Sequence, residues 1–315
     1  MDKEQIAVLV ATYNGEKYLT EQIKSLLIQK KVDVTIYIHD DYSKDGSFEI
    51  INRLSSEFPD KIKVLNSDKN LGVVRTYQFL LDNVEADYYF FCDQDDVWYD
   101  DKIIQEVKIL VHSDNRPALV YSDLEVVDSD LNTITNSMFT HMNVKNSEKT
   151  SMLLTQNVIT GNTVGFNRAL RNLVVNVFRM DNDFVLMHDG WLGLIASIYG
   201  DLIFLNKPTV KYRQHANNVI GARKSKLNKL FKVNKLRKAI VNTILQAELL
   251  DKKMSLVVDT NSKSQNIVHS YATILNYTPK KRLRLLIKNQ LKKQGLLRNI
   301  VFVILILTEK RAITN

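Results

Sequence analysis

The chain has 315 residues, 45% of them hydrophobic and only four of them proline, so it is expected to fold as a globular protein with a sizeable core. A single cysteine, Cys92, excludes a disulfide framework and suits a reducing compartment. The net charge of +8 combines two unlike parts, because residues 1–220 hold 22 Lys and Arg against 31 Asp and Glu, while residues 221–315 hold 21 against 4. An acidic body of net charge −9 is therefore followed by a basic tail of +17. The charged N-terminus leads directly into an apolar run, so we expect no secretory signal peptide.

Apolar runs alternate with segments of helical spacing through the first third of the chain. Strands are predicted at residues 6–11, 34–38, 61–66 and 88–92. Helices are predicted between them, beginning at Glu16, at Ser47 as the N-cap residue, and after Asn70-Leu71-Gly72. This alternation predicts a parallel sheet with right-handed crossovers, whose ligands bind outside the carboxyl ends of the strands.

Polar residues follow three of these strands and should meet at one edge of the sheet. They are Thr12–Asn14, Asp40–Asp41 and Asp93–Asp96. Only one glycine, Gly15, follows the first strand, so the glycine-rich dinucleotide fingerprint is missing and a dehydrogenase is not expected. A diphosphate bound here would need a cation in place of that loop.

The stretch Tyr88–Trp98 is an apolar strand that runs into three carboxylates within four residues. Asp93, Asp95 and Asp96 repel one another unless something cationic shares them. A divalent metal ion is one solution, since hard cations take oxygen ligands and bridge carboxylates to phosphates. The alternative is a solvated acidic turn that caps the following helix.

The middle of the chain continues the α/β pattern less regularly. Helices are predicted at 101–111, 168–178 and 188–196, strands at 118–122, 161–166, 203–205 and 210–212, and an irregular polar excursion at 123–151.

Six short motifs that are rich in polar residues follow one another along the chain. They are Thr12-Tyr13-Asn14, Asp40-Asp41, Asn70-Leu71-Gly72, Asp93-Gln94-Asp95-Asp96, His188-Asp189-Gly190-Trp191 and Tyr212-Arg213-Gln214-His215. Over about residues 5–220 the chain resembles the inverting glycosyltransferase family two with the GT-A fold, and its later motifs resemble the bacterial rhamnosyltransferase-type branch. The resemblance implies a mostly parallel sheet flanked by helices. It divides the chain into a catalytic domain at 1–220, with donor half 1–112 and acceptor half 113–220, and a helical basic extension at 221–315.

The resemblance also implies roles for individual residues. A nucleotide-sugar site would be lined by Thr12, Tyr13, Asn14, Glu16, Asp41, Asn70, Gly72, Arg75, Asp93 and Asp95, with Asp41 on the base and Asp93 near the ribose and sugar. Asp95 and Asp96 match the metal-binding pair for Mg²⁺ or Mn²⁺, Asp96 being the surest ligand, and His215 would contact the metal or the diphosphate. Asp189 matches the catalytic base, and His188 and Trp191 would face the acceptor. The family commonly has Gly or Asn where this chain has Tyr42.

Structural alternatives exist for several of these residues. Asp189 could be an N-cap before its helix. Trp98 and Trp191 could be packing residues instead of sugar platforms. Arg75 could form an ordinary surface ion pair instead of contacting a diphosphate.

The basic tail contains helical segments that carry apolar residues on one face, around residues 227–245 and 280–293. Its apolar run at 300–307 is too short to cross a bilayer, which takes about 20 residues. The tail could pack on the catalytic domain, lie on anionic lipid, or bind nucleic acid, and no nucleic-acid module is recognised. We favour a tail that packs and also touches an anionic membrane.

Together these features predict a metal-dependent inverting glycosyltransferase of cell-surface polysaccharide synthesis, such as capsule synthesis. It would move rhamnose or a hexose from a dTDP- or UDP-linked donor to a saccharide or lipid-linked acceptor. We expect it in the cytoplasm, peripheral on the inner face of the plasma membrane. Two alternatives are a non-catalytic membrane-associated assembly partner that keeps the fold, and a nucleotidyltransferase, which would need a basic glycine-rich loop near residue 12.

Overall fold

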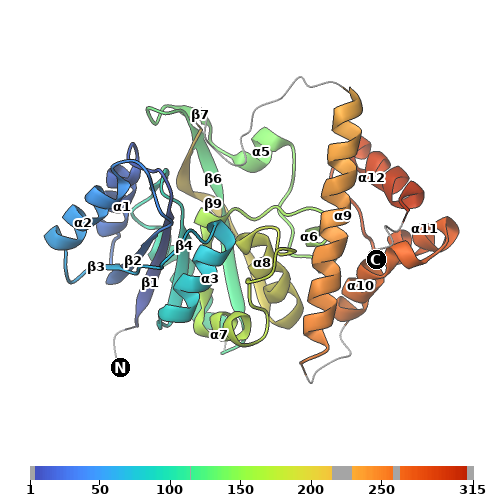
Figure 1. Cartoon of the computed structure of the whole chain (residues 1–315), viewed down its shortest axis with the longest axis horizontal. Coiled ribbons are helices and arrows are strands. Elements are labelled where there is room, and N and C mark those ends of the chain that lie inside the picture. Colours follow the sequence, from blue (N-terminus) through green and yellow to red (C-terminus); the bar gives the residue numbers. More distant parts are fainter. Residues whose placement is uncertain (1–3, 114, 215–228, 258–262, 311–315) are drawn as a thin grey trace.

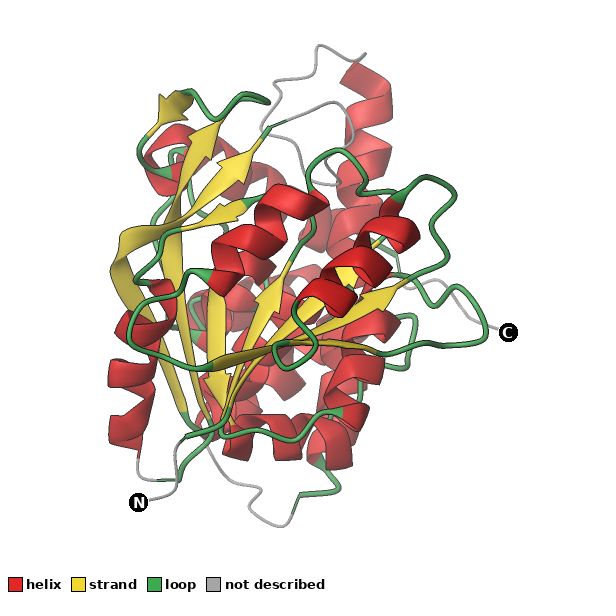
Figure 2. Ribbon diagram, turned by 90° about the vertical axis from the view of Figure 1, so that its left-hand side faces the viewer, coloured by secondary structure: helices red, strands yellow, loops and turns green. Residues whose placement is uncertain are grey.

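The computed structural model describes residues 4–113, 115–214, 229–257 and 263–310. Within them, a curled sheet of nine strands has the order β3-β2-β1-β4-β8-β6-β9-β5, with β7 paired to β6. Helices cover both faces of this sheet (Figures 1 and 2). The helices of the basic tail lie on the side of the molecule away from β1, β2 and β3 (Figure 1). The predicted α/β architecture is confirmed.

The first half of the sheet is parallel. Its elements are β1 (Ile6–Thr12), α1 (Leu19–Leu27), β2 (Val34–Asp40), α2 (Ser47–Glu57), β3 (Ile62–Val64), α3 (Val73–Asn83) and β4 (Tyr88–Cys92). β1 lies between β2 and β4, with Ile6 paired to both Val34 and Tyr88. The carboxyl ends of β1, β2 and β4 therefore reach the same edge, as the sequence predicts.

The second half of the sheet is mixed. Its elements are β5 (Val97–Trp98), α4 (Lys102–Leu110), η1 (Val111–Ser113), β6 (Ala118–Val127), β7 (Thr133–Thr135), α5 (Met138–Met142), α6 (Thr150–Leu153), η2 (Gly161–Thr163), β8 (Val164–Asn167), α7 (Arg168–Asn176), α8 (His188–Tyr199) and β9 (Asp201–Arg213). β8 is antiparallel to both β4 and β6, whereas β6 and β9 are parallel.

Several predicted bounds and caps are wrong. The helix predicted from Glu16 begins at Leu19, and the strand predicted at 161–166 begins as the 3₁₀ helix η2 and becomes a strand at Val164. The excursion at 123–151 begins as strand, because β6 continues to Val127 and pairs with β7. The two strands predicted at 203–205 and 210–212 form one long strand, β9, with register shifts along its pairing with β6. Ser47 is the first residue of α2 and makes no capping hydrogen bond, since its hydroxyl accepts from the Gly15 amide at 2.8 Å.

Alternate residues of the central strands supply two cores on opposite faces of the sheet. On β1, Ala7 and Leu9 belong to one core, and Val8 and Val10 belong to the other. β4 divides in the same way, with Phe91 on the first face and Phe90 on the second. Strands buried on both faces read as continuous apolar runs, which is why they are recognisable in the sequence.

The tail consists of α9 (Lys229–Met254), α10 (Lys263–Ala272), η3 (Ile274–Asn276), α11 (Pro279–Lys288) and α12 (Leu296–Thr308). Ile240, Ile244 and Leu250 of α9 are buried in the same core as α8, so the described tail packs on the body. Among the helices that the structure describes, none combines the length and the apolar character needed to cross a membrane.

Candidate functional site

Gln94, in the middle of the acidic turn, ties that turn to the loop after β1. Its side-chain amide accepts from the Tyr13 backbone N–H at 2.5 Å and donates to the Tyr13 carbonyl at 2.9 Å. A Cβ atom on Gly15 would lie only 2.6 Å from the Gln94 Oε1, so a larger residue there would push the Gln94 side chain out of this position. The Asp41 amide donates to the Thr12 carbonyl at 2.8 Å, which brings the third loop to the same place.

The loops after β1 and β2 hold one another through the predicted polar residues. The Thr12 hydroxyl donates to Asp40 at 2.9 Å, and the Asn14 side chain accepts from the Lys44 amide at 2.8 Å. Glu16 accepts from the Gly46 amide at 3.0 Å. These three side chains thus fix loop geometry, whereas the Tyr13 side chain is half exposed and can meet a ligand.

Asp41, Asn70 and Gly72 come together at the start of α3. The Asp41 carboxylate accepts from the Leu71 amide at 2.5 Å and the Gly72 amide at 2.8 Å, and the Asn70 side chain donates to the Asp41 carbonyl at 2.6 Å. Gly72 has φ of 76°, a left-handed conformation that favours glycine. Asp41 therefore fixes the N-terminus of α3, and contact between Asp41 and a nucleotide base stays a prediction.

Arg75 forms an ion pair with Asp183, with 2.5 Å between Nη2 and Oδ1, and both side chains are substantially exposed. In this structure Arg75 therefore makes a surface ion pair, which is the alternative named above for this residue. A role on a diphosphate would require this exposed pair to open.

The three acids of the turn have unequal surroundings. Asp96 is fully buried, and its carboxylate accepts from the Arg213 amide at 2.9 Å and from the Asn162 side chain. Burial, then the charges of Asp95 and Asp93, raise the pKa of Asp96 well above its usual value. Asp93 and Asp95 are only partly buried. Burial and the charges of Asp95 and Asp189 raise the pKa of Asp93 to about 7.

A divalent cation fits this turn by ligand type and by charge. Carboxylate oxygens are the ligands that hard cations take, and a cation would relieve the repulsion that raises the pKa of Asp93 and Asp96. In the described part of the chain, no group of three or more Asp, Glu, His or Cys side chains is gathered to hold an ion. His215, the third predicted ligand, lies outside the described residues.

Arg213, whose role the sequence does not reveal, holds the backbone of the acidic turn. Its Nε donates to the Asp95 carbonyl at 2.9 Å, its Nη1 to the Ser129 carbonyl at 2.6 Å, and its Nη2 to Glu21 at 2.5 Å. The guanidinium lies 4.4 Å from the centre of the Tyr18 ring. This buried cation joins β9, α1 and the turn, and the only sequence signal for it is its place in the Tyr212–His215 motif.

Asp189 lies in the first turn of α8, one residue after the helix begins at His188, so the N-cap alternative is wrong and Met187 occupies that position. The Asp189 Oδ1 accepts from the Asn157 side chain at 3.0 Å and from the Gly190 amide at 2.5 Å. Burial raises its pKa to about 6, although these bonds and the Gly161 amide oppose the rise. A carboxylate with such a pKa is ionised at neutral pH and can accept a proton. Asn157, its partner, carries no recognisable sequence signal.

The two predicted acceptor-facing residues are both buried. Trp191 is fully enclosed in the core and its indole N–H donates to the Phe178 carbonyl at 2.6 Å, so a packing role replaces the predicted sugar platform. Trp98 is also buried. His188 is buried too, and burial lowers its pKa to about 3, which keeps the imidazole neutral.

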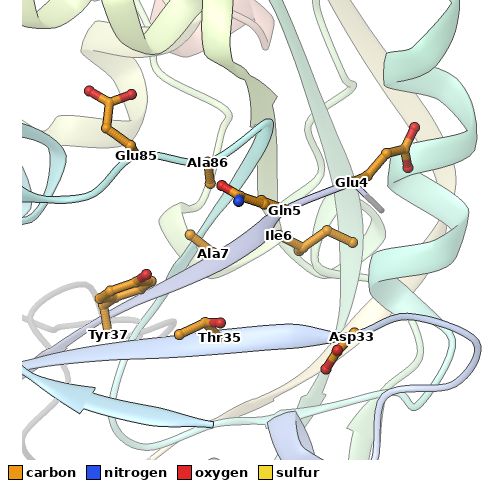
Figure 3. A pocket seen from close by; sticks show the side chains of 9 residues that line it. All are labelled: Glu4, Gln5, Ile6, Ala7, Asp33, Thr35, Tyr37, Glu85 and Ala86. Atoms are coloured by element: carbon orange, nitrogen blue, oxygen red, sulfur yellow. The ribbon is translucent and has the colours of Figure 1, made fainter. Parts of the chain in front are cut away.

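A cavity of about 250 Å³ lies at the opposite end of the strands, lined by Glu4–Ala7, Asp33, Thr35, Tyr37, Glu85 and Ala86 (Figure 3). These residues stand at the amino ends of β1, β2 and β4, whereas ligands of parallel sheets bind at the carboxyl ends. We therefore assign the functional site to the acidic turn and not to this cavity.

Comparison with known proteins shows which family the sequence matches. The family described as "Glycosyl transferase family 2" matches residues 7–178. The dTDP-rhamnosyl transferase RfbG of Shigella flexneri is 31% identical over 225 residues, which cover 68% of this chain and 74% of that protein. An uncharacterized glycosyltransferase of Nostoc sp. is 29% identical over 225 residues, covering 69% of this chain and 67% of that protein. A Rickettsia conorii glycosyltransferase is also 29% identical, over 130 residues that are 41% of this chain but only 21% of that protein.

Two solved structures share the fold at low sequence identity. The mannosyltransferase PcManGT of Pyrobaculum calidifontis, in complex with GDP-Man and Mn²⁺, has a TM-score of 0.53 and 15% identity, covering 96% of this chain and 79% of that one. TarS 1-349 of S. aureus, in complex with UDP-GlcNAc, has a TM-score of 0.50 and 17% identity, covering 96% and 90%.

Proposed function

Because the chain belongs to glycosyl transferase family 2, and is therefore a glycosyltransferase, we propose that it moves a sugar from a nucleotide-diphosphate sugar to a saccharide or lipid-linked acceptor with inversion. The observation that carries this proposal is the pairing of two acidic centres at one end of the sheet. The acids after β4 and Asp189 of α8 are close enough for the charge of Asp189 to raise the pKa of Asp93. One centre can serve the leaving group while the other serves the acceptor.

The donor would enter where the loops after β1, β2 and β4 meet. The exposed ring of Tyr13 would contact the nucleotide, with Asp41 toward the base and Asp93 toward the ribose and sugar. Thr12, Asn14 and Glu16 would support these loops from within, as their hydrogen bonds to the loop after β2 suggest.

We propose that Asp95, on the open side of the turn, meets Mg²⁺ or Mn²⁺ first, with Asp96 and His215 completing the set. When bound, such an ion would stabilise the negative charge that develops on the leaving diphosphate. The chain's own contribution is to hold the Asp95 backbone through Arg213 and to keep Asp96 fixed between Asn162 and β9.

Asp189 would act as the general base that removes the proton of the acceptor hydroxyl as it attacks the anomeric carbon. The amides of Gly190 and Gly161 and the side chain of Asn157 orient its carboxylate. Proton transfer to one positioned carboxylate typically contributes about 10²–10⁴-fold to the rate. His188, behind it, is neutral and buried and would shape the acceptor side without carrying charge.

The donor sugar is proposed to be rhamnose carried on dTDP, since the relative from Shigella flexneri is named a dTDP-rhamnosyl transferase. We place the enzyme on the inner face of the plasma membrane, where its basic tail would contact anionic lipid near a lipid-linked acceptor of polysaccharide synthesis. The exposed apolar residues of α11 and α12, beside many lysines and arginines, support this placement.

A donor screen tests the proposed function. Hydrolysis and binding of dTDP-rhamnose, UDP-linked hexoses and GDP-mannose are measured with Mn²⁺, with Mg²⁺ and with a chelator. We expect metal-dependent hydrolysis of one donor, fastest for dTDP-rhamnose. A non-catalytic assembly partner would hydrolyse none of them while still binding the membrane, and that result would overturn the proposal.

A further inference from the structure

Tyr77 of α3 contacts Asp93 of the acidic turn and His188, the residue that precedes Asp189. Its hydroxyl lies 2.9 Å from the Cys92 carbonyl oxygen and 3.2 Å from the Oδ1 of Asp93, and it donates its one proton to this pair of acceptors. The side chain is fully buried. The hydroxyl therefore fixes the end of β4 and the orientation of the first acid of the turn.

The ring of Tyr77 contacts the residue before Asp189. It stacks on the imidazole of His188 with 4.0 Å between the ring centres and 29° between the planes. It also packs against Phe91, with 4.4 Å between the ring centres and the planes tilted by 48°. Within the described residues, neither ring nitrogen of His188 has a hydrogen-bond partner. In the described structure, the imidazole is held by packing against the rings of Tyr77 and Phe91 and by the close approach of Gly161.

His188 is joined to the proposed base by the chain itself. Asp189 follows it in the first turn of α8, and Gly161, which lies against His188, also donates its amide to Asp189. A shift of the imidazole would therefore move the carboxylate.

We propose that Tyr77 is a positioning residue that sets the placement of Asp93 relative to Asp189, through its hydroxyl at one end and its ring at the other. This inference rests on the proposed function, in which Asp93 serves the donor and Asp189 the acceptor. α3 suits the task because Asp41 fixes its first turn through the amides of Leu71 and Gly72. The helix α3 therefore links the loops that would bind the donor to the neighbour of Asp189, the proposed base.

The two ends of the link predict two separable effects. Tyr77→Phe keeps the ring and removes the hydroxyl, so the KM for donor hydrolysis should rise about tenfold, as for one lost hydrogen bond to a charged group, with kcat nearly unchanged. His188→Ala removes the stack and leaves the hydroxyl, so kcat for transfer to acceptor should fall while donor binding is retained.

Tyr89→Phe is the matched control. Tyr89 is another fully buried tyrosine, on β4, and its hydroxyl accepts from the Ala86 amide at 2.7 Å, at the amino end of the strand and away from the site. It should lose stability without a change in KM. If Tyr77→Phe gave the same KM and kcat as Tyr89→Phe, or only lowered the active fraction, the inference would be overturned while the proposed function stood.

A measurement without substrate separates this inference from the proposed function. Hydrogen–deuterium exchange is followed in peptides covering residues 188–194 of wild type, Tyr77→Leu and Tyr89→Leu. Faster exchange in Tyr77→Leu alone supports the link even if no nucleotide sugar is hydrolysed. Equal exchange in both variants contradicts it.

Discussion

The backbone amide of Arg213 donates to the Oδ1 of Asp96 at 2.9 Å, while the Arg213 Nε donates to the carbonyl of Asp95 at the same distance. The last strand of the sheet thereby fixes two adjacent acids in different ways. Asp96 has its carboxylate turned inward to protein donors, whereas Asp95 is held by its backbone and its side chain is partly exposed. Neighbours in sequence should therefore respond differently to the same substitution.

Asp96→Ala should be mainly destabilising. It leaves the Arg213 amide and the Asn162 side chain buried without their acceptor, at about 1–3 kcal/mol for each group. Chemical denaturation should show a lower free energy of unfolding. Asp95→Ala is the control, and it should unfold close to wild type but lose metal-dependent donor hydrolysis. If Asp96→Ala had the same free energy of unfolding as wild type, the stabilising role of the Asp96 carboxylate would be contradicted.

Asp189→Asn should lower the kcat of transfer by about 10²–10⁴-fold and leave donor binding intact. The wild-type rate should also depend on pH in a defined direction. Burial raises the pKa of Asp189 to about 6, so the carboxylate becomes protonated and inactive as pH falls through that value. An unperturbed aspartate would stay ionised down to about pH 4. Steady-state transfer between pH 5 and 8 checks the midpoint, and a flat profile would exclude Asp189 as the base.

The α/β order and the meeting of the three loops could be predicted because their signals are local. Apolar runs mark strands that are buried on both faces, and the acids stand directly after them. The buried state of Asp96 could not be predicted, since its partners Asn162 and Arg213 are 66 and 117 residues away in sequence.

Two other errors have physical causes in particular residues. α8 is buried from His188 to Ala196, so its sequence has no polar face from which the inward position of Trp191 could be read. β6 escaped recognition beyond residue 122 because it carries buried Asp123 and Glu125, which Ser137 and Thr133 satisfy from the following segment.

Lys102 and Glu106 form a fully buried ion pair under the acidic turn, with Lys102 also 4.8 Å from the centre of the Trp98 ring. Burial lowers the pKa of Lys102 and raises that of Glu106 to about 7, so both charges are costly inside the protein. Lys102→Met alone should lower the free energy of unfolding by about 3–5 kcal/mol, because Glu106 is left unpaired. The double variant Lys102→Met/Glu106→Leu should recover most of this loss in urea denaturation. Additive losses would contradict the coupling.

The tail exposes apolar side chains beside positive charge. Ile287 of α11 is 71% exposed, and Leu296 and Leu297 at the start of α12 are each 78% exposed. α11 carries several lysines and arginines beside Ile287, whereas the two leucines of α12 have the exposed Lys292 and Arg298 near them in the sequence. Positive charge of this kind suits an anionic membrane surface, where each Lys or Arg contributes about 1 kcal/mol. Truncating the tail is a poor test, because Ile244 and Leu250 of α9 belong to the core.

Point variants test membrane binding instead. Leu296→Glu/Leu297→Glu should reduce cosedimentation of the full chain with anionic phosphatidylglycerol vesicles, because it removes apolar contact and adds negative charge. Ile28→Glu is the control, since Ile28 is 63% exposed but lies at the end of α1, on the opposite side of the molecule from α12 (Figure 1). Wild type should bind neutral phosphatidylcholine vesicles weakly, and added salt should release it from anionic ones. Equal binding of wild type to anionic and neutral vesicles would contradict an electrostatic contribution to membrane binding. Equal binding by Leu296→Glu/Leu297→Glu and Ile28→Glu would contradict the role of α12.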